Sequence, residues 1–359
     1  MTRQIPKDAA GITPDWLTHA LRSGGAGDVT VTAAKVDRIG QDQGFTGGAL
    51  YRIIPDYRAE GSGPSSLVAK LSPTDPVLSA RFFAANAREV AFYGRVAGQG
   101  ALPVPRCHFG AVDPQRHATA ILLQDMHGAR SVPFATGLAA GDAGALVDAL
   151  AAVHAAWWQH PQLADAGGMA MEREFDLADC WARYPARLAD LLGDISLPTA
   201  FITLVDHLVT NHRQVFSDLQ AQGPLTCLHG DAQADNVMFD AGGRAILFDW
   251  QMTGRGRGAS DVAYALVSSC TPLTRRACER DLVARYHRAL CQHGVTGYAL
   301  DRCWQDYLRG VGAKVLMTVV ATVLFDNGSA HKVAWRRADL TRLLAFCADH
   351  KIGPATFAA

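Results

Sequence analysis

The chain has 359 residues, 49% of them hydrophobic and 19% charged, so a disordered chain is excluded and two packed lobes or domains are expected. Lysine plus arginine and aspartate plus glutamate number 34 each, and this balance gives no net field to recruit nucleic acid or an anionic membrane as a partner. The N-terminus shows no signal-peptide pattern and the eight cysteines lack disulfide or zinc spacing, so we expect a cytoplasmic enzyme with reduced thiols.

Residues 1–124 are predicted to form a small N-terminal lobe around an antiparallel sheet. Strand-like runs separated by turn residues lie at 29–39, 49–54, 67–71, 106–112 and 118–123. A helix is predicted after the third run, because 72–76 is a helix-start signal and Phe82, Glu89 and Tyr93 then share one helical stripe.

Residues 125–359 are predicted to form a larger, mainly helical lobe. Helical periodicity begins after about residue 127 and returns at 176–192, 198–221, 259–269, 274–293, 301–325 and 333–350. One short β-hairpin, 237–248, interrupts these helices. The apolar run from Val315 to Phe325 is too short to span a bilayer and is predicted to be a buried helix. The fold class is therefore α+β.

The strongest chemical signal is His229-Gly230-Asp231, followed by Asn236 and, after the hairpin, by Asp249. Asn236 directly precedes the first hairpin strand and Asp249 directly follows the second, so antiparallel pairing brings both to the open end. Their amide and carboxylate oxygens suit Mg²⁺ holding a polyphosphate, and Asp231 is placed to accept a proton from a hydroxyl group. These are the parts that phosphoryl transfer needs; a surface turn with ordinary capping residues is the alternative.

The same motif resembles the signature of the aminoglycoside phosphotransferase and choline kinase-like families, which are small-molecule relatives of the protein kinases. Further similarity, to the ecdysteroid kinase-like branch, lies in the segments Arg88–Tyr93, Leu122–Met126 and Phe248–Gln251. The resemblance spans about residues 30–270. It implies a bilobal protein-kinase-like fold with ATP between the lobes, Asp231 as catalytic base, and Asn236 and Asp249 as ligands of Mg²⁺.

Lys70 resembles the family's phosphate-binding lysine, and Glu89 the helix carboxylate that pairs with it. The residues themselves favour this pairing, because Glu89 lies on an apolar stripe and would be costly to bury without a cation. Lys70 projects from the strand face opposite to Leu67 and Leu71, so it can supply that cation. Two unrelated surface charges are the alternative.

Two further segments are expected to bind the nucleotide. Gly44-Phe45-Thr46-Gly47-Gly48 lies between two strands, where glycines let backbone N–H groups approach phosphate. Glycine-rich hairpins are common, however, and this spacing differs from GxGxxG. The segment 123–126 is expected to form the interlobe hinge, where backbone groups of Gln124 and Met126 would bind the adenine edge; a plain linker is compatible with the same residues.

Other polar residues receive supporting roles. Asp261 matches a family aspartate that braces the catalytic loop, and its position before an apolar helix suits an N-cap. His229 is expected to organise the loop and His154 to pack in the core. Arg255 and Arg257 lie in a glycine-rich segment and could contact phosphate or acceptor, or form a solvated flexible loop.

We therefore expect an ATP- and Mg²⁺-dependent phosphotransferase acting on a hydroxyl group of a small molecule. An antibiotic, a steroid-like alcohol, an amino alcohol and a secondary metabolite are all compatible, since acidic residues at 172–179 favour an amine while the basic excess after residue 301 disfavours a polycation. A nucleotide-binding pseudokinase is one alternative, although it would not need the four residues Lys70, Asp231, Asn236 and Asp249. A metal-dependent hydrolase is another, but it would need further ligands that we do not find.

Overall fold

The computed structural model describes residues 4–40, 48–96, 101–166, 175–193, 195–325 and 328–358. The chain forms two compact units, which are described separately below. Unit 1 consists of Met1–Gly128 and Asp249–Gln251, and unit 2 of Ala129–Phe248 and Met252–Ala359. The domain boundary expected between residues 124 and 125 stays a prediction.

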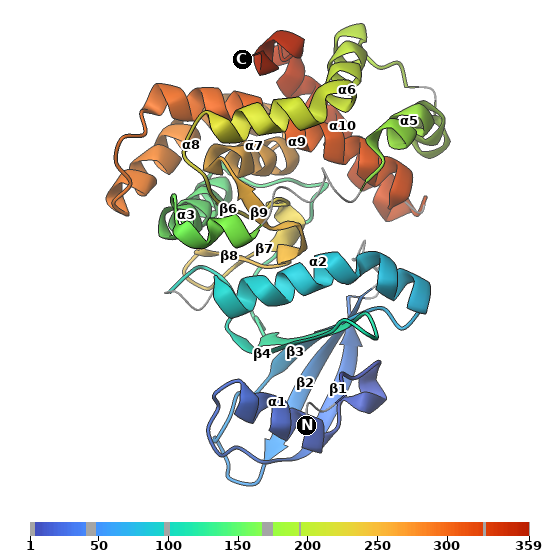
Figure 1. The fold of residues 1–359 in the computed structure, drawn as a ribbon, viewed down its shortest axis with the longest axis vertical. Helices are drawn as coiled ribbons and strands as arrows, with labels where there is room; N and C mark the ends of the chain where they lie inside the picture. The colour runs from blue at the N-terminus through green and yellow to red at the C-terminus, as the bar shows by residue number, and fades with distance from the viewer. Residues whose placement is uncertain are drawn as a thin grey trace. The chain divides into compact units, whose positions relative to one another are not determined.

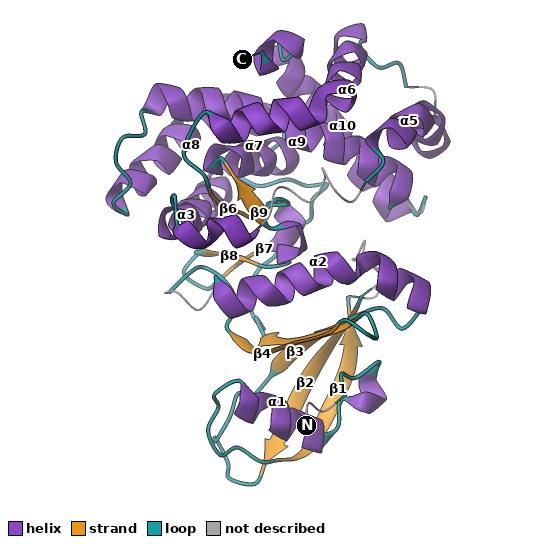
Figure 2. Ribbon diagram, in the orientation of Figure 1, coloured by secondary structure: helices purple, strands orange, loops and turns teal. Residues whose placement is uncertain are grey.

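Unit 1 is built on a five-stranded antiparallel sheet with the strand order β1-β2-β3-β5-β4 (Figures 1 and 2). Its elements are α1 (Pro14–Ser23), β1 (Val31–Ile39), β2 (Ala49–Tyr57), β3 (Leu67–Leu71), α2 (Pro76–Arg95), β4 (Cys107–Asp113) and β5 (Ala118–Gln124). The five predicted strands and the predicted helix are confirmed. Helix α1 was not predicted, although Thr13 accepts the N–H of Trp16 as its N-cap and Pro14 opens its first turn.

The two helices of unit 1 cover opposite faces of the sheet (Figure 1). Helix α1 packs on the face where Leu67, Ala69 and Leu71 are buried, and its Trp16 joins this apolar core. Helix α2 packs on β4 and β5. Because side chains alternate along a strand, β3 gives its apolar residues to the α1 face and presents Lys70 to α2.

Unit 2 is mainly helical and carries two small antiparallel sheets, β6-β9 and β7-β8 (Figure 2). Its elements are α3 (Ala140–Ala156), α5 (Leu177–Leu192), α6 (Thr199–Ala221), β6 (Thr226–Leu228), β7 (Val237–Phe239), β8 (Ala245–Leu247), β9 (Gly254–Gly256), α7 (Gly258–Ser269), α8 (Pro272–Gln292), α9 (Leu300–Leu324) and α10 (Ala330–Asp349). The predicted hairpin and the predicted helices are confirmed, with ends that differ by a few residues. The pairing of β6 with β9 was not predicted.

Helix α9 is the central core helix of unit 2. It packs against α5, α6, α7 and α8. By length and composition alone it could cross a membrane, but most of its apolar window is buried inside the unit. The prediction of a buried helix at Val315 to Phe325 is therefore confirmed, and the helix begins earlier, at Leu300.

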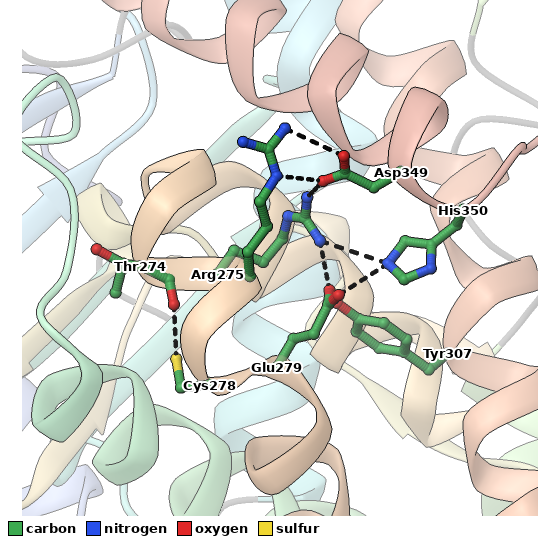
Figure 3. Close-up of polar contacts among 8 residues, drawn as sticks. Thr274, Arg275, Cys278, Glu279, Tyr307, Asp349 and His350 are labelled. Atoms are coloured by element: carbon green, nitrogen blue, oxygen red, sulfur yellow. Dashed lines mark hydrogen bonds and ion pairs between the residues drawn. The ribbon is translucent and has the colours of Figure 1, made fainter.

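A polar cluster fastens the end of α10 to α8 and α9 (Figure 3). Arg275 Nη1 lies 2.5 Å from Glu279 Oε2, and Arg275 also pairs with Asp349. The hydroxyl of Tyr307 donates to the same Glu279 oxygen at 3.1 Å, and His350 Nε2 lies 2.9 Å from the other oxygen. Burial alone would raise the pKa of Glu279, but its hydrogen bonds with His350 and Arg275 lower it below the ordinary value.

Candidate active site

The loop between β6 and β7 carries the His229-Gly230-Asp231 motif, and helix α7 holds its backbone. Asp261 accepts the N–H of His229 at 2.5 Å and that of Gly230 at 3.0 Å, which confirms that it braces this loop. Its expected N-cap position is wrong, because Arg257 is the N-cap of α7 and Asp261 lies in the first turn. Gly230 has a φ of +79°, and a Cβ there would lie 2.2 Å from the carbonyl oxygen of Met252, so the path of the loop requires glycine.

The side chain of Asp231 is held by several donors. Nδ2 of Asn236 donates to both the carbonyl oxygen and Oδ2 of Asp231, each at 2.8 Å, and Gln233 Nε2 lies 3.4 Å from Oδ2. The buried hydroxyl of Tyr264 also lies near Asp231. Burial, followed by the charge of Asp231 and hydrogen bonding to it, raises the pKa of Tyr264 well above its ordinary value. Sequence reasoning missed Tyr264, although it lies one helical turn after Asp261 and therefore on the same face of α7.

Both histidines have the structural roles expected from the sequence. Nε2 of His229 lies 3.0 Å from the carbonyl oxygen of Phe248, and Nδ1 accepts the N–H of Asp231 at 3.3 Å. These partners fit a neutral ring protonated on Nε2. His229 therefore links the loop to the end of the hairpin. His154 is fully buried and lies 2.8 Å from the hydroxyl of Tyr286, so it packs in the core.

A buried cation lies close to the same site and was also missed. Lys314 Nζ lies 5.0 Å from the ring centre of Tyr264 and 2.5 Å from Oδ1 of Asp339, whose other oxygen pairs with Arg336 at 2.9 Å. Burial lowers the pKa of Lys314, and the negative charges of Asp339 and Asp231 oppose this. A single lysine inside an apolar helix gives no sequence signal of which carboxylate it will meet.

In unit 1, Lys70 forms the predicted ion pair with Glu89. Lys70 Nζ lies 2.7 Å from Glu89 Oε2 and 2.7 Å from Asp249 Oδ1. Burial alone would lower the pKa of Lys70, but the charges of Asp249 and Glu89 and its hydrogen bonds with them raise it above its ordinary value. Burial raises the pKa of Glu89, against the attraction of Lys70. The ammonium group therefore stays charged, and its role toward a nucleotide stays a prediction.

Asp249 belongs to a short segment that packs on α2. Trp250 stacks on Phe92 with ring centres 3.7 Å apart, and Arg88 donates to the carbonyl oxygen of Gln251 at 2.6 Å. Asp249 has a φ of +65°, a left-handed conformation that is uncommon outside glycine. Such conformations cluster at functional sites, which agrees with a functional role for this carboxylate.

Asn236 and Asp249 have the chemistry of Mg²⁺ ligands. The amide nitrogen of Asn236 is engaged by Asp231, which leaves its carbonyl oxygen for a cation, and the side chain of Asp249 is 35% exposed. Both are hard oxygen donors. The described residues contain no group of three or more His, Cys, Asp or Glu that could hold a metal ion, which is the kind of cluster that the hydrolase alternative would need.

The structure does not test the other residues predicted to bind the nucleotide. Gly44, Phe45, Thr46 and Gly47 lie outside the described residues. Gln124 ends β5 and is exposed, and Met126 is half-buried. Between them, Asp125 Oδ2 pairs with Arg52 at 2.8 Å, so this segment is anchored to the sheet. The adenine contacts stay predictions.

Of the two alternatives for Arg255 and Arg257, the solvated flexible loop is wrong, and contact with phosphate or acceptor stays a prediction. Arg255 lies in β9, which pairs with β6. Arg257 is 4% exposed and forms an ion pair with Asp306, which is itself 1% exposed. A glycine-rich run looks flexible in sequence, but here the glycines allow a short strand to lie close to its neighbours: a Cβ at Gly256 would meet Leu228 at 2.5 Å.

Comparison with known proteins identifies a phosphotransferase family. The model of the phosphotransferase enzyme family APH matches residues 54–300, which is more than half of the chain. No curated protein sequence matches. The ecdysteroid kinase-like branch expected from the sequence stays a prediction.

Solved structures show the same fold at low sequence identity. A candidate aminoglycoside phosphotransferase from Ralstonia eutropha JMP134 is 16% identical with a TM-score of 0.52, over 89% of this chain and 93% of that one. The amicoumacin kinase hAmiN, solved with AMP-PNP, Ca²⁺ and Ami, is 14% identical with a TM-score of 0.55, over 89% of both chains. These similarities confirm the predicted α+β kinase-like fold.

Proposed function

Because the chain belongs to the phosphotransferase enzyme family and is a small-molecule kinase, we propose that it transfers the γ-phosphoryl group of ATP to a hydroxyl group of a small molecule in a Mg²⁺-dependent reaction. The observation that carries this proposal is the geometry around Asp231. Its carboxylate is oriented by Asn236 at 2.8 Å and its loop is braced by Asp261. A fixed carboxylate of this kind suits the orientation of an acceptor hydroxyl.

In the proposed reaction, Asp231 orients the acceptor hydroxyl and takes up its proton. The acceptor oxygen forms a bond to the γ-phosphorus while the bond from that phosphorus to the bridging oxygen breaks, and ADP leaves with the bonding electrons. Asn236 and Tyr264 keep the carboxylate in place during this step. Positioning of this kind supplies a large part of the catalysis in phosphoryl transfer.

We assign Asn236 and Asp249 as the metal ligands, on the basis of their hard oxygen atoms. When bound, Mg²⁺ would neutralise the negative charge of the phosphate groups. Lys70 would contribute a further positive charge to the phosphates, since its raised pKa keeps it protonated. Glu89 orients the Lys70 side chain, because its Oε2 lies 2.7 Å from Lys70 Nζ. ATP is supported as the donor by the structure of hAmiN, which was solved with AMP-PNP. The proposed nucleotide contacts are Gln124, Met126 and the residues from Gly44 to Gly47.

The first test measures nucleotide binding through the change in Tm of wild type and of Asp249→Asn. We expect ATP with Mg²⁺ to raise the Tm of wild type, and the rise to need Mg²⁺ and to be lost in Asp249→Asn. Asp281→Asn is the matched control, because Asp281 is exposed on α8 and should leave the rise intact. No stabilisation by saturating ATP or GTP would contradict the proposal.

The second test is an acceptor screen with hydroxylated antibiotics, steroid-like alcohols, amino alcohols and secondary metabolites. ADP release that depends on the added alcohol would identify the acceptor, with Asp231→Asn as the inactive control. Nucleotide binding without transfer to any alcohol would instead favour the pseudokinase alternative.

A further inference from the structure

A pocket in unit 2 is lined by three arginines and by none of the residues assigned above to catalysis or metal binding. Arg255 comes from β9, Arg257 from the turn into α7, and Arg309 from α9, while α6 and Leu228 of β6 complete the wall. The pocket leaves about 20 Å³ for the centre of a water molecule. This is room for one small polar group rather than for a whole nucleotide.

Two arginines that line this pocket each have a guanidinium nitrogen without an acceptor among the described residues. Nε of Arg255 and Nη2 of Arg257 are both buried without a hydrogen-bond partner there. The other nitrogens of Arg257 are engaged, because Nε donates to the carbonyl oxygen of Leu219 at 2.5 Å and Nη1 pairs with Asp306. Buried donors are normally satisfied, if not by protein then by water or an ion.

The local charge balance favours an anion over water alone. Arg257 and Arg302 share the single carboxylate of Asp306. Arg309 donates to uncharged oxygens, and Arg255 has no carboxylate partner in the described part of the chain. These four arginines therefore have one carboxylate, that of Asp306, among their described partners. The planar guanidinium group matches the oxygens of carboxylates and phosphates.

We propose that this pocket binds the carboxylate or phosphate group of a small molecule through Arg255 and Arg257. The site would lie beside the elements that carry the catalytic loop, since Leu228 directly precedes His229 and Arg257 is the N-cap of α7. A bound oxyanion would complete the hydrogen bonds of the two unpartnered nitrogens and link β9 to the start of α7. Such a ligand binds only the folded state and must therefore stabilise it.

The experiment measures the Tm of the full chain without nucleotide, in sodium phosphate, sodium acetate and sodium chloride at equal ionic strength. Phosphate, acetate or both should raise the Tm of wild type by a few degrees above the value in chloride, and the more effective anion identifies the group. Arg255→Gln should lose this rise. Arg213→Gln is the matched control, because Arg213 is exposed on α6 and should keep it.

A second variant and a crystal soak test the same site independently of the Tm. Arg255→Lys keeps the charge but not the fork, and we expect calorimetric titration with the more effective anion to show at least about tenfold weaker binding. Crystals soaked in selenate should show an anomalous peak between Arg255 and Arg257. No anion-dependent rise in wild type, an equal rise in Arg255→Gln, or, where phosphate is the more effective anion, no selenate peak would each overturn the proposal. Arg255→Gln should still bind ATP with Mg²⁺, so failure of this site is distinguishable from failure of the proposed kinase function.

Discussion

The buried hydroxyl of Tyr264 lies close enough to Asp231 for the charge of that carboxylate to raise its pKa. Tyr264 lies one helical turn after Asp261 on α7, and Asp261 binds the backbone N–H groups of His229 and Gly230. One face of a single buried helix therefore holds the backbone of the catalytic loop and places a buried hydroxyl near its aspartate. The orientation of the proposed base depends on the packing of α7 as much as on the loop itself.

Replacing Tyr264 by phenylalanine should lower the rate of phosphoryl transfer without abolishing nucleotide binding. A hydrogen bond to a charged group contributes about 1.5–3 kcal/mol, so we expect kcat to fall roughly ten- to hundredfold while the KM for ATP changes little. Steady-state ATP hydrolysis, with water as the acceptor, measures both. Tyr57→Phe is the control, because that hydroxyl donates to Pro64 in unit 1 and its loss should leave kcat unchanged. Equal kcat values for Tyr264→Phe and wild type would show that the hydrogen bond has no part in orienting Asp231.

Gly230→Ala should disrupt the catalytic loop by a steric clash. Gly243, in the turn of the hairpin, has a similar φ of +77° but an open space around its missing Cβ, whereas a Cβ at Gly230 would meet Met252 at 2.2 Å. Left-handed backbone in alanine costs about 1–2 kcal/mol, so Gly243→Ala should lose about that much free energy of unfolding in urea. Gly230→Ala should lose more and be inactive. If the two variants had the same stability and activity, the clash would be refuted.

Much of the fold follows from patterns that are local in sequence. The five strands of unit 1 and the six helices predicted after residue 175 each carry a clear apolar period, and the ion pair of Lys70 with Glu89 follows from strand alternation combined with a helical stripe. Strands β6 and β9 have three residues each, too few for any period, and their pairing depends on tertiary packing.

The supporting residues of the site could not be predicted in the same way. Asp235 accepts a hydrogen bond from Trp335 Nε1 at 2.9 Å, 100 residues away in the chain, and from the N–H of Phe134 at 3.2 Å. Lys314 meets Asp339 only because α9 and α10 pack together. Spacing within one segment carries no information on partners that are distant in sequence. The motif residues lie close together in sequence, so the motif could be recognised without knowledge of the fold.

Lys70→Met should destabilise unit 1 mainly by leaving Glu89 unpaired. Glu89 is 1% exposed, and removing one partner of a buried ion pair costs about 3–5 kcal/mol. Replacing both residues, in Lys70→Met with Glu89→Leu, should recover most of this loss, because no buried charge is then left without a partner. A double-mutant cycle from urea denaturation measures the coupling. Additive effects of the two substitutions would show that the pair contributes no coupling to stability.

The polar cluster around Glu279 should make stability depend on pH in the acidic range. The pKa of Glu279 in the folded state is lowered from its ordinary value of 4.5, because its hydrogen bonds with His350 and Arg275 outweigh its burial. The stabilisation is therefore fully present above about pH 4.5 and is lost as the pH falls through the folded pKa. Glu279→Gln should lower the free energy of unfolding by about 2 kcal/mol at pH 7, and this difference from wild type should shrink as the pH falls below 4.5. Asp281→Asn, on the exposed side of α8, should follow wild type at every pH. A difference between Glu279→Gln and wild type that stayed constant down to pH 3 would mean that the ionised carboxylate is not the source of the stabilisation.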